Sequence, residues 1–544
     1  MKGFDNIAKK KCANYFECDG KPLKEIQQKW LHDDYVKFIR FAHWRIEQTG
    51  HGVVAFITNH GYLDNPTFCG MRQALMQDFD ELYIIDLHGN SKRKEICPDG
   101  SKDENVFDIQ TGVSIALMIR STTSSKRKPA RVFRTDVFGL RDVKYDWLLK
   151  HDWRNTDFVE VFPETPSYLF LKQNNKLKKE YESGISVTEL FPLCGTGIVT
   201  ARDSLTIHMN SEKVWKTVKD FSSLSESEAR EKFELGKDAR DWKVKNAQAD
   251  ISVSGPKRQN IKPILYRPFD TRFTYYTGKG KGFIGQPCSK VMNHMLNGSN
   301  IGLCFVRPMS PRYEFSVHVA ESMIDQCAVG NKSAGAGITY LAPLWEIDKK
   351  NKKPNLAPEV WDSLKDSIDP DEFFAYVYAL LNCPEYKSKY SEFLRTDYPR
   401  IFITDDKKIL RGLSKLGSEL INIHLLKDDR LEGGKVVFAK SGSNEVGQIS
   451  FEPESCKLYI NRDQFFDNIS PAAWSHQVGG YNVLEKWLKD RRGTKLDHDS
   501  IMCFEKIITG IELSVAIVAK INKFVLDAGG LPFRGKAAAK KEDL

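Results

Sequence analysis

The sequence has 544 residues, 41% hydrophobic and 28% charged, so it is long enough for two or three folded domains and too apolar for a disordered tail. The net charge of +9 permits nucleic-acid binding without requiring it. The eleven cysteines include no Cys-x-x-Cys pair, which is typical of reduced thiols and argues against a zinc site. With no signal-peptide core and no apolar run of membrane length, we expect a soluble cytoplasmic protein.

The first 130 residues or so alternate helix and strand patterns in the manner of a parallel α/β sheet. Residues 35–46 form a helical pattern, and Asn65-Pro66 has the capping chemistry that starts a second helix. The charged segment 89–105 predicts a loop. Short, continuous apolar runs predict three buried strands, at 53–57, 82–87 and 113–119.

The pattern beyond residue 131 is more mixed. Ser225-x-x-Glu228 is a capping box that starts a charged helix, and the polar stretch 248–260 is typical of a linker. Short strands rich in Tyr, Phe and Arg follow residue 264. Two helices are predicted near the end, at 371–381 and 507–526, and then a solvated basic tail at 534–541.

Three sequence stretches carry a family resemblance. They are 33–40 followed by 52–65, then 86–90 leading to 105–112, and finally Tyr266-Arg267-Pro268-Phe269-Asp270-x-Arg272. At these intervals the chain resembles the C-terminal part of type ISP restriction–modification enzymes, which join a nuclease, a helicase-like motor, an adenine methyltransferase and a target-recognition domain. The resemblance implies sequence-specific binding of double-stranded DNA in the service of N6-adenine methylation.

The resemblance also implies a fold and its division into domains. We expect an α/β chain with a partial Rossmann-like methyltransferase sheet over residues 1–130, a coupling segment over 131–260, and an α+β target-recognition region over 261–544. A domain that carries only the later strands of its sheet leaves a sheet edge and an apolar face to be covered.

Methyl transfer to adenine needs two elements that the family places before residue 33. One is a glycine-rich turn for S-adenosylmethionine, and the other is an Asn/Asp-Pro-Pro-Tyr/Phe loop that holds the flipped base. We therefore expect no catalytic loop in this chain, an incomplete S-adenosylmethionine site, and a partner that carries the upstream half. The alternative is a stand-alone DNA-binding or interaction module without enzymatic activity.

The resemblance assigns a base-stacking role to Phe107, because an aromatic residue before the later strands clamps the flipped base in such enzymes. An ordinary buried Phe is the competing interpretation. Asn59, His60 and Tyr62 follow a predicted strand and are placed at the rim of the pocket, since ligands bind beyond the carboxyl ends of strands in open α/β sheets. His88 and Asn90 hold the equivalent position after the next strand.

Basic residues interleaved with aromatic ones in the second half suit a nucleic-acid face, although Tyr-rich strands are equally typical of a core. The Gly278–Gly282 loop lacks the Gly-Lys-Ser/Thr ending of a nucleotide-binding loop, but its lysines suit a DNA phosphate. The candidate DNA-binding residues are Arg267, Arg272, Tyr275, Tyr276, Lys279 and Lys281.

Two short patterns look catalytic and are better explained by helix capping. Asn382-Cys383-Pro384-Glu385-Tyr386 follows a predicted helix, where a proline is ordinary termination. Pro370-Asp371 with Glu385 and Lys387 fits a restriction-nuclease pattern on paper, but Pro-Asp is common at a helix start. No metal site is predicted, and no motif supports RNA binding.

Overall fold

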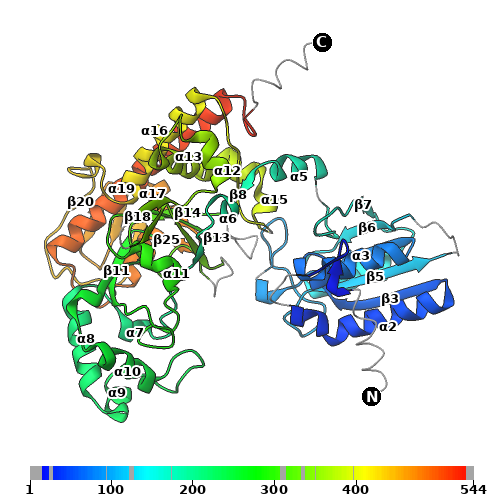
Figure 1. The fold of residues 1–544 in the computed structure, drawn as a ribbon, viewed down its shortest axis with the longest axis horizontal. Helices are drawn as coiled ribbons and strands as arrows, with labels where there is room; N and C mark the ends of the chain where they lie inside the picture. Colours follow the sequence, from blue (N-terminus) through cyan, green and yellow to red (C-terminus); the bar gives the residue numbers. More distant parts are fainter. Residues whose placement is uncertain are drawn as a thin grey trace. The chain divides into compact units, whose positions relative to one another are not determined.

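The computed structural model describes residues 15–23, 28–93, 95–121, 128–172, 174–306, 314–331, 337–348, 351–395 and 397–533. The chain forms two compact units, with the boundary between Lys179 and Glu180. Each unit has its own hydrophobic core. Each unit contains both helices and strands, and the strands of the chain form several separate sheets (Figure 1).

The first unit is built on a five-stranded sheet. Its strands lie in the order β3 (Gly52–Asn59), β5 (Val113–Arg120), β4 (Glu81–Asp86), β6 (Arg131–Asp136) and β7 (Val159–Val161). The three predicted strands are confirmed, but the all-parallel pairing is wrong: only β4 and β6 pair in parallel. The chain reverses through the long loop after β4 instead of crossing over through a helix, so β5 returns antiparallel.

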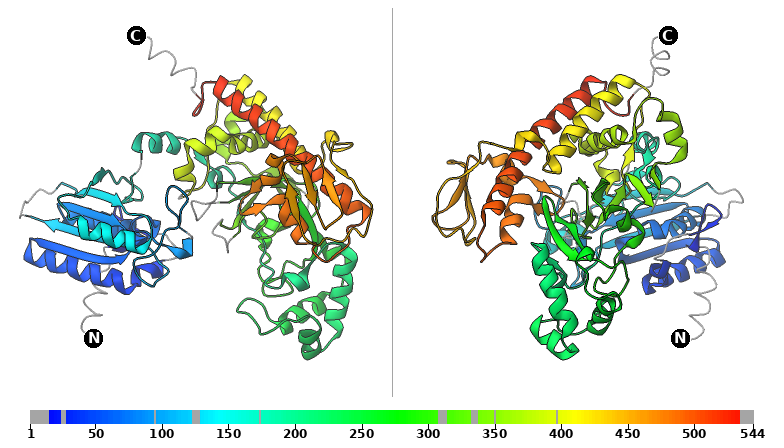
Figure 2. Two further views of the ribbon diagram at one scale, coloured as in Figure 1. Left: turned by 180° about the vertical axis from the view of Figure 1, so that it is seen from behind. Right: turned by 60° about the vertical axis from the view of Figure 1, so that its left-hand side comes forward.

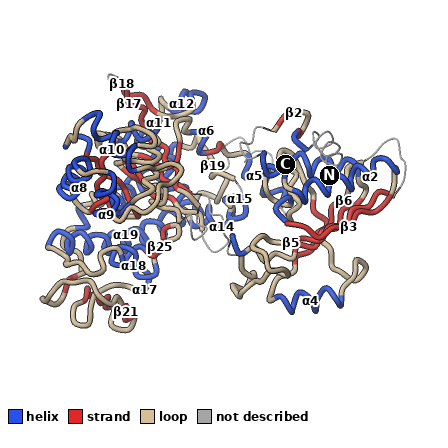
Figure 3. Tube along the Cα trace, turned by 90° about the horizontal axis from the view of Figure 1, so that it is seen from below, coloured by secondary structure: helices blue, strands red, loops and turns tan. Residues whose placement is uncertain are grey.

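Helices cover the two faces of this sheet unequally. On one face, α2 (Asp34–Thr49) and α3 (Cys69–Asp78) share a core cluster with Val54, Leu82 and Met118. On the other face, α4 (Arg141–Lys150) brings Trp147 and Leu148 against a second cluster of buried residues that includes Leu87 and Val113. Figure 3 shows α4 and α2 on opposite sides of the strands. The apolar periodicity of α2 explains its position, since its buried residues recur on one face.

The sheet continues past residue 130, because β6 and β7 pair into it. The segment 131–260 is therefore divided between the two units. Its later part is helical: α8 (Ser211–Ser223), α9 (Glu226–Lys232) and α10 (Val244–Ser254). The predicted capping box at Ser225 is confirmed. The predicted linker at 248–260 is wrong, because half of it is α10 and Ile251 packs in the core.

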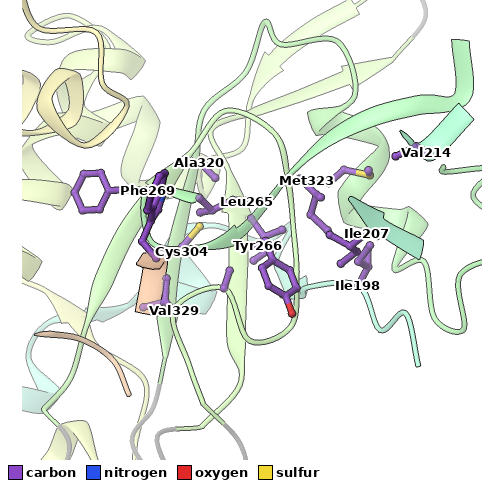
Figure 4. Packing of buried hydrophobic residues seen from close by; sticks show 14 of the residues in the cluster. Ile198, Ile207, Val214, Leu265, Tyr266, Phe269, Cys304, Ala320, Met323 and Val329 are labelled. Carbon is purple, nitrogen blue, oxygen red and sulfur yellow. The ribbon is translucent and has the colours of Figure 1, made fainter. Parts of the chain in front are cut away.

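Two four-stranded sheets form the centre of the second unit. One has the order β10 (Ile207–His208), β12 (Asp270–Tyr275), β11 (Ile261–Arg267) and β15 (Met323–Ile324). The other has the order β14 (Val317–Ala320), β13 (Gly302–Val306), β16 (Thr339–Pro343) and β9 (Gly195–Thr196). Figure 4 shows side chains from both sheets in one cluster, with Leu265 of β11 near Cys304 of β13.

Three long helices pack beside these sheets: α13 (Pro370–Asn382), α16 (Lys407–His424) and α19 (His498–Asp527). Figure 2 shows α16 and α19 side by side. Gly417 allows α16 to approach α13, since a Cβ there would lie 1.9 Å from the Ala375 carbonyl oxygen. Both helices predicted near the end are confirmed, and the tail at 534–541 lies outside the described residues.

A third sheet of four short strands follows α16 in the sequence. Its order is β20 (Val437–Phe438), β23 (Phe465–Asp467), β22 (Lys457–Tyr459) and β21 (Ser450–Glu452), all antiparallel. Phe466 ties this small sheet to the core through its contact with Phe504 of α19. Among the described helices, none combines the length and apolarity needed to cross a bilayer.

Candidate functional site

The carboxyl ends of β3 and β4 meet in a buried polar cluster. His60, just after β3, places its Nδ1 3.0 Å from Oδ1 of Asp86, the last residue of β4. Asn90 Nδ2 lies 3.2 Å from the other ring nitrogen of His60, Nε2. Arg134 of β6 donates to the second Asp86 oxygen at 2.7 Å.

His88 is the charged centre of this cluster. Its Nδ1 lies 2.8 Å from Glu95 and its Nε2 lies 2.9 Å from Asp136. Burial alone would lower the pKa of His88, but the carboxylates of Asp86, Asp136 and Glu95 raise it to about 10. The Phe138 ring stacks on the imidazolium with centroids 3.8 Å apart. His88 is therefore protonated at neutral pH.

His60, Asp86 and His88 place three ligand-type atoms within 4.8 Å of one another. Both ring nitrogens of His88 donate to carboxylates, so this side chain offers no lone pair to a metal ion. Asp86 is engaged as well: burial would raise its pKa, but Arg134, His88 and His60 hold the pKa well below its ordinary value. The cluster is a satisfied ion network.

The predicted rim residues take part in this arrangement in different ways. Asn59 accepts a hydrogen bond from the Gly61 amide at 2.7 Å and so forms the turn that presents His60. Tyr62 is buried, and its hydroxyl has no hydrogen-bond partner among the described residues. His60 packs over Gly112, where a Cβ would lie 2.3 Å from the imidazole ring. The structure thus brings the two predicted strand ends together.

Phe107 lies in the loop between β4 and β5, beside a cavity of about 560 Å³. Its side chain is 44% exposed, so the interpretation as an ordinary buried Phe is wrong. Asn105 shapes the loop: its Oδ1 accepts from the Phe107 amide at 2.9 Å, and its Nδ2 donates to the carbonyls of Gly89 and Thr111. The ring is therefore presented to the cavity by a fixed backbone.

A buried ion pair anchors the same loop. Lys144 of α4 donates from Nζ to Asp103 at 2.7 Å, and both side chains are fully buried. Lys144 also donates to the carbonyls of Leu87 and Glu104, while Asp103 accepts from the amides of Gly89 and Gly139. Sequence reasoning missed this pair, because a lysine within a helix and an aspartate within a polar loop are both typical of solvated positions.

Most of the predicted DNA-binding side chains in the second unit are buried. Arg267 pairs with Asp325 at 2.9 Å and covers the Tyr266 ring. Arg272 bridges Asp270 and Asp490 at 2.6 and 2.7 Å. The Tyr275 hydroxyl accepts from the Lys257 amide, and the Tyr276 hydroxyl donates to the Pro287 carbonyl. These four side chains form hydrogen bonds or ion pairs inside the fold, although the buried Nε of Arg267 has no hydrogen-bond partner among the described residues.

The two lysines of the glycine loop differ from those four residues. Lys279 and Lys281 are exposed, and neither forms an ion pair with a described residue. The loop is tied down at its base, where Asp250 accepts from the Phe283 amide and the Thr277 hydroxyl. Both short catalytic-looking patterns are structural: Asp369 caps α13, and Tyr386 is fully buried.

Comparison with known proteins gives a family for the second unit. A family model described as the type ISP C-terminal specificity domain matches residues 189–508. A search of curated proteins gave no match.

The chain also resembles solved structures at low sequence identity. They are a DrdV–DNA complex (TM-score 0.66, 20% identity), the ATP-dependent type ISP restriction-modification enzyme LlaBIII bound to DNA (0.67, 18%), and a nuclease-deletion mutant of the type ISP enzyme LlaGI with a DNA substrate mimic (0.65, 18%). The alignments cover 96%, 96% and 95% of this chain but 54%, 35% and 50% of those chains. The chain therefore spans about a third to a half of their length.

Proposed function

The chain belongs to the family of type ISP C-terminal specificity domains, and we propose that it recognises a specific double-stranded DNA sequence within a restriction–modification system. The family match over residues 189–508 carries the proposal, and the described residues of that range lie in the second unit. The DNA-bound state of the similar solved structures supports it.

Among the candidate DNA contacts, the exposed lysines remain. Lys279 and Lys281 project from an anchored glycine loop, and a DNA phosphate is a suitable ligand for them. Arg267, Arg272, Tyr275 and Tyr276 are instead engaged in contacts within the second unit. Phosphate contacts fix the register of a protein on the duplex, and side chains that reach base edges provide the sequence specificity.

For the first unit we propose a contribution to a Rossmann-like N6-adenine methyltransferase domain. Phe107 is half exposed beside a cavity at the end of the sheet where strand-end ligand sites occur in α/β folds. A flipped base needs an aromatic face to stack on, and Phe107 offers one. The role proposed for Phe107 is to clamp the adenine.

S-adenosylmethionine, the cofactor that the resemblance implies, does not fit the residues present at these strand ends. The turn after β3 is Asn59-His60-Gly61, and the turn after β4 leads into His88-Gly89. Neither is a glycine-rich turn, and the polar groups of His60, Asp86 and His88 are engaged with one another and with neighbouring carboxylates. We propose that a further polypeptide segment supplies both the cofactor pocket and the catalytic loop.

The open side of β3 supports this partner. Among the described residues β3 pairs only with β5, so its other edge is free. Val53 and Ile57, on one face of β3, are 59% and 45% exposed, and Ala55 between them is exposed as well. An unpaired edge beside exposed apolar residues is the surface that a partner strand and helix would cover.

Selection from a randomised duplex DNA library at two salt concentrations tests the recognition proposal. Enrichment of one short sequence by the purified chain supports it and identifies the target. Binding that enriches nothing and disappears with salt would contradict it, because only non-specific phosphate contacts would then be present.

Mass measurement and thermal unfolding of the purified chain test the partner proposal. We expect association with a protein carrying the upstream half, or poor solubility without it. A soluble monomer that melts in one cooperative transition would contradict the proposal.

The role of Phe107 is tested with the partner present. Phe107→Ala should lower adenine methylation strongly, while Phe107→Tyr, which keeps the aromatic ring, should retain it.

A further inference from the structure

Three loops of the second unit meet beside the small sheet of β20 to β23. They span residues 440–447, 461–464 and 491–496. Backbone hydrogen bonds join the first loop to the third: the Val446 amide donates to Thr494, the Gly493 amide to Val446, and the Leu496 amide to Asn444, at 2.8 to 3.0 Å. Segments about fifty residues apart in the sequence thus form one continuous piece of surface, the three-loop surface.

A buried amide side chain fixes the middle of this surface. Gln464 is 2% exposed. Its Nε2 donates to the Lys440 carbonyl at 3.0 Å and to Asn444 Oδ1 at 2.8 Å, and its Oε1 accepts from the Asn444 amide at 2.8 Å and from Asn461 Nδ2 at 3.1 Å. All donors and acceptors of the amide are engaged, so the first two loops have a single relative arrangement.

This fixed backbone carries unpaired positive charge. Each of the three loops contributes at least one exposed cation: Lys440, Arg462, Arg492 and Lys495. None of these four forms an ion pair with any residue that the structure describes. Glu445 and Asp463 are the exposed acids in the same loops, so the positive charges outnumber the negative ones four to two.

Two charged residues just before the third loop are paired within the fold. Arg491 pairs with the buried Asp270 at 2.9 Å, and Asp490 pairs with Arg272. Neither carboxylate is therefore available to neutralise Arg492 or Lys495. The rest of the surface is hydroxylic, with Ser441, Ser443 and Thr494 all exposed. A polar, cationic and preorganised surface suits a wet interface with a phosphate backbone better than an apolar protein interface.

We propose that the three-loop surface binds the phosphates of duplex DNA and sets the register of the specificity domain on its target. The inference rests on the proposed function and names residues that neither the sequence motifs nor the family match single out. Rigid loops bearing Lys and Arg place their charges without further ordering, so each contact releases condensed counterions at little conformational cost.

Fluorescence anisotropy of the full chain with a fluorescein-labelled DNA duplex, measured over a range of salt concentrations, tests this inference. The variants are Lys440→Gln, Arg462→Gln, Arg492→Gln and Lys495→Gln, singly and together. Each substitution is expected to reduce the slope of log K against log salt by about 0.9, and the combined variant by about 3 to 4.

The control removes two positive charges elsewhere, and its counterpart on the three-loop surface is the double variant Arg492→Gln and Lys495→Gln. Lys520→Gln and Lys523→Gln alter exposed lysines near the end of α19, and Lys520 lies about 33 Å along the helix from its first residue. The slope of this double variant should match that of the unaltered chain. If the unaltered chain binds DNA and the fourfold variant has the same slope, the inference is overturned while the proposed function stands. If the unaltered chain does not bind DNA, the proposed function itself fails.

Discussion

Replacing Lys144 by Met should destabilise the first unit by about 3–5 kcal/mol, the cost of removing one partner of a buried ion pair. Lys144 and Asp103 have no exposed side-chain surface, and Lys144 Nζ donates to Asp103, Leu87 and Glu104 at 2.6 to 2.7 Å. The variant leaves a buried carboxylate without its cation and two carbonyls without this donor. The alkyl part of Met fills the same volume, so the loss is electrostatic and not a cavity effect.

Guanidinium unfolding of the full chain, followed by circular dichroism, measures this loss. Hydrogen exchange localises it, because the Gly89 and Gly139 amides that donate to Asp103 should lose protection. Lys150→Met is the matched control, since Lys150 is an exposed residue in the last turn of the same helix. If the two variants differ by less than about 1 kcal/mol, the pair contributes no more than a surface pair and the reasoning is refuted.

Three further predictions concern the charge networks and the packing. The pKa of His88 is raised from 6.5 to about 10. The stability that this imidazolium contributes is therefore complete below about pH 6.5 and lost as the pH rises toward 10. The melting temperature of the full chain should fall over this pH range, and it should fall less in the His88→Asn variant. Gly112→Ala places a Cβ 2.3 Å from the His60 ring and should cost about 1–3 kcal/mol in denaturant unfolding, whereas Gly280→Ala, with its nearest atom at 4.0 Å, should be near neutral. Arg272→Gln should cost about 3 kcal/mol, while Lys281→Gln should leave the melting temperature unchanged and weaken DNA binding; equal melting temperatures for these two variants would contradict the structural role of Arg272.

Local sequence patterns predicted the elements that local physics controls. The continuous apolar runs became β3, β4 and β5, and the capping box at Ser225 begins α9. Asn65 accepts a hydrogen bond from the Thr67 amide, as its capping chemistry predicts. The sequence also placed His60 and His88 directly after two predicted strands, and in the structure both strands belong to one sheet. Each of these features depends on residues within one element or its immediate neighbours.

The assignment of roles in the second unit needed long-range information. Arg267 and Arg272 stand in a basic and aromatic segment that suits a nucleic-acid face as well as a core. Their partners Asp325 and Asp490 are 58 and 218 residues away in the sequence, and only the packing of β11 and β12 against later elements brings them together. The same holds for the three-loop surface, because Gln464 joins loops that no local pattern connects.

The sequence by itself determined where three strands of the first unit and the two helices near the end lie, which strand ends carry polar side chains, and the resemblance that led to the specificity-domain family. The tertiary structure alone decided which charges are buried and paired and which are left exposed. The physical reason is that helix and strand periodicity act over a few residues, whereas the burial of a charge depends on whether a distant partner reaches it. Lys144 and Lys440 both have polar neighbours in the sequence. In the structure, Lys144 is buried in an ion pair with Asp103, whereas Lys440 is exposed.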